Sequence, residues 1–307
     1  MAFRLKPDKS VSSEIRRIVL RQLETAISEL RSVGDPESDE AIHDARRRVK
    51  KIRAVIRLVR PVLDQSSVAV DKDLRDVSHL LAPVADGQGV IATLDQLARR
   101  YQDLLPPRVV ASIRAGLVDR GARADRHAWT EQVLQTAAAA LRAERRHVKE
   151  WRLHADGFRA IAPGLERSVR RARNAMMQAW ARPDAAHYHA WRRYVKDHWF
   201  HVRLLEGPCA NRLAAEQRRL EALDGMLGEH HNLVLLRHVL VTDSRVSRQQ
   251  TAQCLRIVSS YQRVLRQHAQ SLGARIYAEK PRRFVRRVKQ LWGPAAPQHV
   301  AAPAQAP

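Results

Sequence analysis

Glycine and cysteine are scarce in this sequence of 307 residues, which contains 12 glycines and 2 cysteines. Strand-like alternation of valine, isoleucine and threonine is nearly absent, whereas alanine, arginine and leucine abound. This composition argues against β-sheet and predicts an all-α protein. With 45% hydrophobic residues, the chain is long enough for one large or two ordinary domains with a buried core.

The two cysteines, Cys209 and Cys254, stand far apart, and neither belongs to a CxxC motif. Such spacing provides neither a disulfide framework nor a thiolate metal site. We expect both to be packing residues of a protein in a reducing compartment.

Long apolar runs are also missing. No stretch of about 18 apolar residues occurs, and the first residues, MAFRLKPDKSVSSEIRR, lack the apolar core of a signal peptide. The sequence has no Walker loop, no GxSxG motif and no metal-binding box. We therefore expect a soluble cytoplasmic protein that has no membrane partner, no cofactor, no metal site and no catalytic residues, and is not an enzyme.

Negative charge is in short supply. The chain has 32 acidic residues against 55 lysines and arginines, a formal net charge of +23. Solubility alone does not explain this imbalance, because a surface of mixed charge would make the protein equally soluble. The excess of positive charge indicates a polyanionic partner. The candidates are a nucleic acid, an anionic membrane and a phosphate polymer.

The basic residues are concentrated in residues 42–63, IHDARRRVKKIRAVIRLVRPVL. On a helix, apolar residues every three or four positions form one stripe, and a basic set occupies another side. That set is His43, Arg46, Arg47, Lys50, Arg53 and Arg57. Adjacent like charges repel by a few tenths of a kcal/mol per pair, so the face requires an anion or nearby carboxylates. Only Asp44 and Asp64 lie within or beside the stretch.

The same pattern recurs 146 positions later without a gap. The matching residues are His43 and His189, Arg46 and Arg192, Arg47 and Arg193, Lys50 and Lys196, Arg57 and Arg203, Leu74 and Leu220, and Leu94 and Leu240. One constant offset that keeps both apolar and polar positions indicates an internal duplication in which each copy carries a basic helix.

Turn signals divide the chain into one domain over residues 10–292, built as halves 10–155 and 157–292. Residues 1–9 are expected to be a loose lead-in and residues 293–307, rich in proline and alanine, a disordered tail. Turns are predicted at 83–89 and around Gly228 to Asn232. The predicted architecture is two pseudo-symmetric four-helix bundles with long closing helices. A two-fold axis would place the two basic helices around a basic central channel.

Two segments resemble the signatures of the CHAD family (conserved histidine α-helical domain). The first is His-x-x-Arg-x-x-x-Lys-Lys-x-Arg, from His43 to Arg53. The second runs from His189 through Arg192, Arg193 and Lys196 to Arg203. Leu227-Gly228 with Asn232-Leu233 is similar to a third element, and the resemblance covers about residues 10–292.

The resemblance implies an all-helical, pseudo-symmetric fold that binds inorganic polyphosphate in a basic channel and can associate with polyphosphate granules. No CYTH-type segment is present, so a stand-alone module is expected. Two positions depart from the pattern: Trp199 occupies the place of Arg53, and Ala85 stands where an arginine is frequent. The predicted binding residues are His43, Arg46, Arg47, Lys50, Lys51, Arg53, Arg57, His189, Arg192, Arg193, Lys196 and Arg203.

Competing interpretations remain for these residues. His43 and His189 are either phosphate donors or buried histidines bonded to backbone carbonyls. His43-Asp44 resembles a metal phosphohydrolase motif, but the second copy has Ala190 in place of the aspartate. The pairs His198 with His201 and His230 with His231 are metal ligands or core and turn residues. The run Arg167 to Arg173 is a channel wall or a solvated face. Non-specific nucleic-acid binding is the alternative function.

Overall fold

The structure is a computed structural model that describes residues 3–31, 38–63, 66–121, 125–242 and 247–293. Within these ranges the chain forms α-helices, one short 3-10 helix and a single isolated bridge between Leu63 and Leu153, so the predicted all-α class is confirmed. No helix in the described ranges is long and apolar enough to cross a membrane. The predicted tail, from residue 294 onward, lies outside the described residues.

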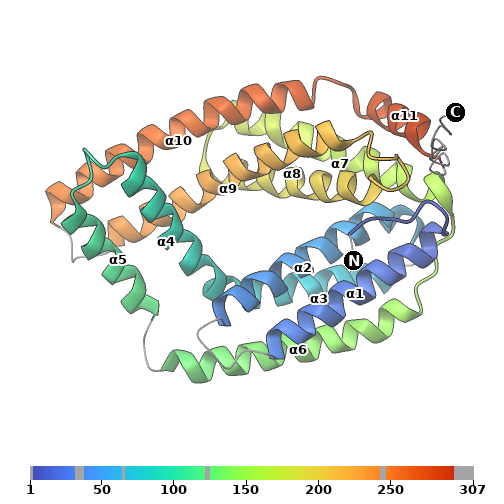
Figure 1. The fold of residues 1–307 in the computed structure, drawn as a ribbon, viewed down its shortest axis with the longest axis horizontal. Helices are drawn as coiled ribbons and strands as arrows, with labels where there is room; N and C mark the ends of the chain where they lie inside the picture. Colours follow the sequence, from blue (N-terminus) through green and yellow to red (C-terminus); the bar gives the residue numbers. More distant parts are fainter. Residues whose placement is uncertain (1–2, 32–37, 64–65, 122–124, 243–246, 294–307) are drawn as a thin grey trace, which may run out of the picture.

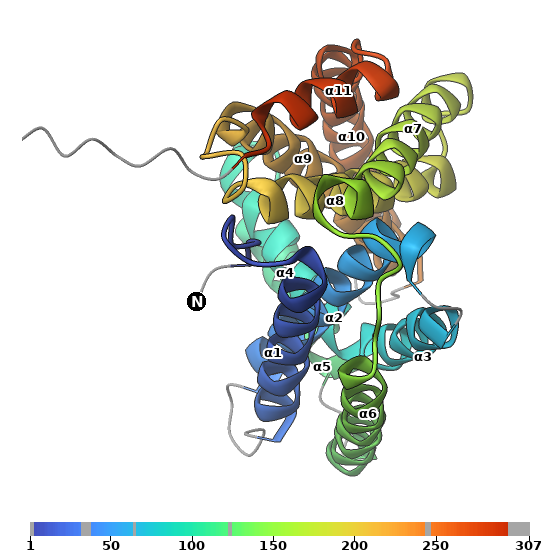
Figure 2. The ribbon, with the colours of Figure 1, turned by 90° about the vertical axis from the view of Figure 1, so that its right-hand side faces the viewer.

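The first half contributes six α-helices to the fold (Figure 1). They are α1 (Val11–Arg31), α2 (Ser38–Val59), α3 (Ser66–Leu80), α4 (Ala82–Arg100), α5 (Pro107–Gly121) and α6 (Asp125–Lys149), with the 3-10 helix Arg60–Val62 after α2. Ser10 starts α1, since its hydroxyl accepts a bond of 3.2 Å from the amide of Ser13. Helices α1, α2, α3 and α6 pack side by side in a ring, as Figure 2 shows end-on.

The second half contributes α7 (Gly157–Ala181), α8 (Ala185–Leu205), α9 (Ala214–Thr242), α10 (Arg248–Ile276) and α11 (Pro281–Leu291). Asp184 caps α8 by accepting the amide of His187, and Ser247 forms a capping box with Gln250 at the start of α10. Along this half, α8 packs against α7 and α9, and α10 packs against α9. Both cysteines are buried free thiols, as predicted for packing residues.

Both internal turn predictions are wrong. Residues 83–89 lie within α4, where Pro83 occupies the first helical turn and loses no intrahelical hydrogen bond. The segment from Gly228 to Asn232 lies inside the unbroken helix α9. By the repeat offset, α9 corresponds to α3 and α4 together, so one long helix in the second half replaces two in the first.

The break after α3 lets α4 and α5 leave the first half. Figure 1 shows α4 crossing from the ends of α2 and α3 to the far part of α9 and α10. There it forms a separate hydrophobic cluster whose members include Val90, Leu94, Leu97, Ile113, Leu233, Leu236, Val258 and Tyr261. The two halves are therefore interlocked, and α4 spans the gap between them.

A larger core runs through the junction of the halves at α2, α7 and α8. Helices α7 and α8 lie over α2 in Figure 2. A Cβ atom at Gly164 of α7 would lie only 1.6 Å from the carbonyl oxygen of Leu58. His201 of α8 donates from Nε2 to the carbonyl of Ala54 at 2.8 Å. These contacts set the distance between the two basic helices.

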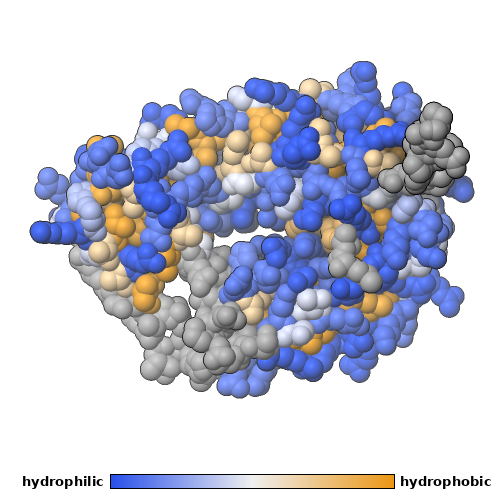
Figure 3. All heavy atoms as spheres, viewed as in Figure 1, coloured by the Kyte–Doolittle hydropathy of each residue, from blue (hydrophilic) through white to orange (hydrophobic). Residues whose placement is uncertain are grey.

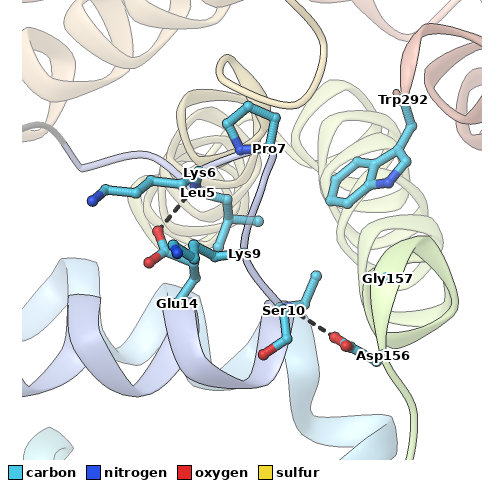
Figure 4. Close-up of a pocket in the computed structure, with 10 residues that line it drawn as sticks. Leu5, Lys6, Pro7, Lys9, Ser10, Glu14, Asp156, Gly157 and Trp292 are labelled. Carbon is cyan, nitrogen blue, oxygen red and sulfur yellow. Dashed lines mark hydrogen bonds between the residues drawn. The ribbon is translucent and has the colours of Figure 1, made fainter. Parts of the chain in front are cut away.

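The first described residues of the N-terminal segment are packed, so the predicted loose lead-in is wrong for residues 3–5, whereas residues 6–9 are exposed. Phe3 and Leu5 are buried, and the Leu5 amide donates to the carbonyl of Leu204 at 2.9 Å. At the start of α1, the Val11 amide donates to Asp156 Oδ1 at 2.7 Å. Figure 4 shows this segment, Asp156 and Trp292 around a small cavity of about 120 Å³. The segment thus ties the first half to the second.

Candidate functional site

The basic faces of α2 and α8 meet at a cavity of about 330 Å³ between the two halves. In the space-filling view the molecule is hollowed between the halves, and hydrophilic residues border the opening (Figure 3). The cavity is lined by His43, Arg46, Lys50, Arg53, Arg57, Arg75, Ser78, His79, Gly89, His189, Arg192, Arg193, Lys196, Asp197, His231 and Asn232. Helices α2, α3, α4, α8 and α9 each supply part of this wall.

Most of the residues predicted from the sequence lie together in this lining, but Arg47, Lys51 and Arg203 do not. Arg47 is half-exposed and bonds to Asp44 at 2.9 Å on its own helix. The basic face of a helix is broad, and side chains at its two edges can point about a third of a turn apart. Only the residues on one part of this face therefore reach the cavity.

Lys51 and Arg203 lie beside aromatic rings, outside the cavity lining. Lys51 Nζ lies 5.5 Å from the centre of the Phe3 ring, and the Arg203 guanidinium lies 5.2 Å from the Trp199 ring. Burial and the neighbouring Arg203 lower the pKa of Lys51 to about 8. Trp199, the departure from the first copy, therefore holds a cation by its ring instead of supplying one to the cavity.

Carboxylates from other helices neutralise one end of the basic cavity. Asp71 of α3 bonds to Arg53 at 2.9 Å, and Asp197 of α8 bonds to Arg57 at 2.8 Å. Asp224 of α9 bonds to Lys196 at 2.9 Å. Of the two requirements stated for the basic face, an anion or nearby carboxylates, the fold thus supplies carboxylates from distant positions of the sequence.

The charge of the lining stays strongly positive after this pairing. The lining contains eight lysine and arginine residues against one aspartate, with Asp71 and Asp224 behind it. Burial lowers the pKa of Arg57, but Asp197 and Asp71 outweigh it and raise the pKa overall. A chain of such cations in a partly enclosed space favours an anionic ligand.

Histidines line the same cavity. His189 and His231 lie with their Nδ1 atoms 3.3 Å apart, close enough for one ring to donate to the other. Burial, and then the charge of Lys50, lower the pKa of His43, with smaller effects of Arg47 and Arg46 in the same direction and of Asp44 in the opposite one. His43 is consequently neutral near pH 7 and can donate one hydrogen bond or accept a proton from a ligand.

Sequence reasoning missed the lining residues of α3 and placed His231 in a turn. Arg75, Ser78 and His79 are spaced by three and four positions, beside the buried apolar residues Leu74 and Val77. That spacing places the three residues on one polar face of the helix. Whether this face points toward the cavity depends on how α3 packs against α2, which the local sequence pattern does not encode.

His198, His201 and His230, rather than His43 and His189, are the buried histidines in the part of the chain that the structure describes. His201 donates to the Ala54 carbonyl, and His198 lies 3.4 Å from the hydroxyl of Tyr277. Burial, and then the neighbouring His201, lower the pKa of His198 to about 3, so it is neutral. Burial, followed by Arg266, lowers the pKa of His230 to about 4. Among the described residues, no group of three or more histidine, cysteine or acidic side chains is arranged to hold a metal ion.

The cationic lining of the cavity is chemically suited to tetrahedral oxyanions. Arginine forks and lysine ammonium groups bind phosphate oxygens by charge-assisted hydrogen bonds. The imidazoles of His43, His79, His189 and His231 add further hydrogen-bonding groups to the lining. The side chain of Ala85, the second departure, lies outside the described part of the chain.

Comparison with known proteins gives a consistent result. The sequence profile of the CHAD domain matches residues 17–241. Among solved structures, PptA from Streptomyces chartreusis is similar, with a TM-score of 0.61, 18% identity, and coverage of 88% of this chain and 100% of that one. The crystal structure of the CHAD domain from the plant Ricinus communis is similar with a TM-score of 0.55, 20% identity, and coverage of 86% and 88%. No curated protein sequence gives a match.

Proposed function

The chain belongs to the CHAD domain family, and on that premise we propose that it binds inorganic polyphosphate, without chemical turnover, in the basic cavity between α2 and α8. Some members of this family bind polyphosphate. The observation that supports the proposal most directly is that two copies of one basic helix line a single cavity.

The chemistry of the cavity fits a linear phosphate polymer. Polyphosphate carries about one negative charge per phosphate along a thin, flexible chain, and it has no bases to recognise. Binding therefore requires successive cations at close spacing, which Arg46, Lys50 and Arg192 supply from two facing helices. Asn232 and the histidines provide further hydrogen-bond partners between them.

A titration with long-chain polyphosphate at low salt tests this proposal. The double variant R46E/K50E should lose at least about 100-fold in affinity, since it removes two cavity cations and adds two repelling charges. The matched control is R248E/R256E, which makes the same change in net charge at exposed positions of α10. Equal losses in the two variants, or no binding by the wild type, would refute the proposal.

Non-specific nucleic-acid binding is the second candidate, favoured by the net charge of +23. Competition separates it from the first. Duplex DNA is too wide to enter a cavity of about 330 Å³, so it should displace polyphosphate poorly when the two are compared at equal phosphate concentration. Efficient displacement would favour the nucleic-acid function.

We further propose a cytoplasmic location on polyphosphate granules and a role without catalysis. Fluorescence microscopy of a tagged chain in cells that accumulate polyphosphate would test the location. Incubation of the protein with polyphosphate and Mg²⁺ or Mn²⁺ would test the absence of catalysis. Phosphate release faster than in the reaction without protein would contradict the proposed non-catalytic role.

A further inference from the structure

The arginines of α7 continue the basic surface beyond the central cavity. We propose that Arg167 and Arg171 form a second subsite for the same polymer, which a polyphosphate chain reaches when it is too long for the cavity. This inference rests on the proposed function and adds to it the path by which a long chain leaves the cavity.

A narrow crevice lies between α7 and the Arg57–Asp197 ion pair at the wall of the cavity. It shares Arg57 and Asp197 with the cavity lining. Its other lining residues are Gly164, Arg167, Ser168, Arg171, Tyr194 and His201. Because Gly164 lets α7 approach the backbone of α2 near Leu58, the arginines one and two turns further along α7 lie beside the end of the cavity.

Tyr194 links the two sets of cations. The guanidinium of Arg193, a cavity residue, lies 4.9 Å from the centre of the Tyr194 ring and donates to its hydroxyl at 3.1 Å. The guanidinium of Arg171 lies 5.9 Å from the same ring centre. One aromatic ring thus contacts a cation of the cavity and a cation of α7, which makes the positive path continuous.

The arginines of α7 fall into two groups, those that form ion pairs with carboxylates and those that do not. Arg170 bonds to Glu166 at 3.5 Å, and the same carboxylate faces Arg282 at 3.6 Å. Within the described part of the chain, no carboxylate forms an ion pair with Arg167 or Arg171. Of the two interpretations of this run, the wall of an anion path therefore applies to Arg167 and Arg171, and the solvated face applies to Arg170.

The surface at another part of the cavity lining has the opposite charge. A cleft between α4 and α9 shares Gly89, Arg192 and Asn232 with the cavity and contains Asp224 and Glu229. These carboxylates accept bonds from Lys196 and from the Tyr261 hydroxyl, at 2.9 and 2.7 Å. This cleft has two carboxylates and one arginine in its lining, whereas the α7 crevice has one carboxylate, Asp197, and three arginines. The favourable direction for the remaining polymer is therefore over α7.

Chain-length dependence is the expected consequence. Tripolyphosphate is short enough to be bound by the cavity alone, whereas a long chain also contacts α7. The double variant R167Q/R171Q should lose about tenfold in affinity for long-chain polyphosphate and leave the affinity for tripolyphosphate unchanged. The matched control R170Q/R173Q removes the same charge from other positions of α7 and should weaken long-chain binding by less than about twofold.

Isothermal titration with both ligands gives distinct outcomes. Equal effects of the two double variants on long chains, or an equal loss for tripolyphosphate, would overturn the α7 path and leave the cavity as the binding site. Failure of the wild type to bind either ligand would instead reject the proposed function. The single variant R171E, at an exposed position, retains the packing of Arg167 and should show the same selective loss if the double variant is unstable.

Discussion

Asp197 is the residue at which folding and binding oppose each other. It is buried, bonds to Arg57 at 2.8 Å and lines the cavity that is proposed to hold an anion. In the free protein it limits repulsion between Arg57 and the other cations. In the bound protein it repels the phosphate chain.

The substitution Asp197→Asn should separate these two effects. We expect a loss of about 1–3 kcal/mol in the free energy of unfolding, because Asp71, at 3.6 Å, is then the one carboxylate among the described residues that pairs with Arg57. We expect a several-fold gain in polyphosphate affinity, because one repelling charge is removed. Urea denaturation and titration measure the two quantities. Asp44→Asn, which removes the carboxylate paired with the half-exposed Arg47, should change both by little, and an equal effect would contradict the assignment.

The histidines of the cavity predict a pH dependence of binding. The pKa of His43 lies below its usual value, mainly because of burial and then the charge of Lys50. A bound phosphate raises that pKa. A group whose pKa is raised on binding adds affinity as the pH falls through the raised pKa of the complex toward the lower pKa of the free protein. Affinity for long-chain polyphosphate should therefore increase from about pH 7.5 to about pH 5.5, by up to about tenfold for each unit of pKa gained.

Titrations at several pH values, with the variant His43→Gln as the comparison, check this expectation. The variant leaves the other lining histidines, His79, His189 and His231, in place, so the comparison isolates the contribution of His43, and the affinity of the variant should change less with pH. An identical pH profile for wild type and variant would show that His43 does not take up a proton when the polymer binds.

At the scale of the helices, the spacing between α2 and α7 sets the distance from the central cavity to the proposed second subsite. That spacing is close because Gly164 faces the Leu58 carbonyl. Helix α2 carries the cavity cations, and α7 carries the proposed second subsite. A change in this contact should therefore act on stability and on binding together.

The substitution Gly164→Ala should lower the free energy of unfolding by about 2–3 kcal/mol, since the new Cβ meets backbone atoms and the helices must separate. Gly225 of α9 is the control, because a Cβ there meets no atom within 4 Å. Gly225→Ala should raise stability by about 0.5–1 kcal/mol through helix propensity. Chemical denaturation of both variants gives the comparison, and similar changes in both would rule out a tight helix contact at Gly164.

At the scale of the whole molecule, binding should respond strongly to salt. Each phosphate neutralised on a flexible chain releases counterions, with a slope of about −0.7 in log K against log salt. If about five phosphates are neutralised, affinity should fall on the order of 100-fold between about 50 and 200 mM salt. The variant R46E/K50E should show a shallower slope than the control R248E/R256E. Equal slopes would mean that the net charge, and not the cavity, determines affinity.

The sequence by itself determined the helical class, the presence of two basic helices and their relation by one offset. The basic residues of the two copies lie in α2 (Ser38–Val59) and α8 (Ala185–Leu205). These features are local or linear in the chain: apolar periodicity encodes a helix face, and duplication keeps the residues in register. The same pattern identified most of the cationic lining of the cavity.

Only the tertiary structure decided which cations share the cavity and which carboxylates accompany them. Arg53 meets Asp71, and Lys196 meets Asp224, across helix contacts that no local spacing encodes. The continuity of α9 through Gly228 was likewise decided by packing against α8 and α10, which outweighs the low helix propensity of glycine. Direction and distance between helices depend on close packing of the whole core, and these fix the charge balance of the cavity.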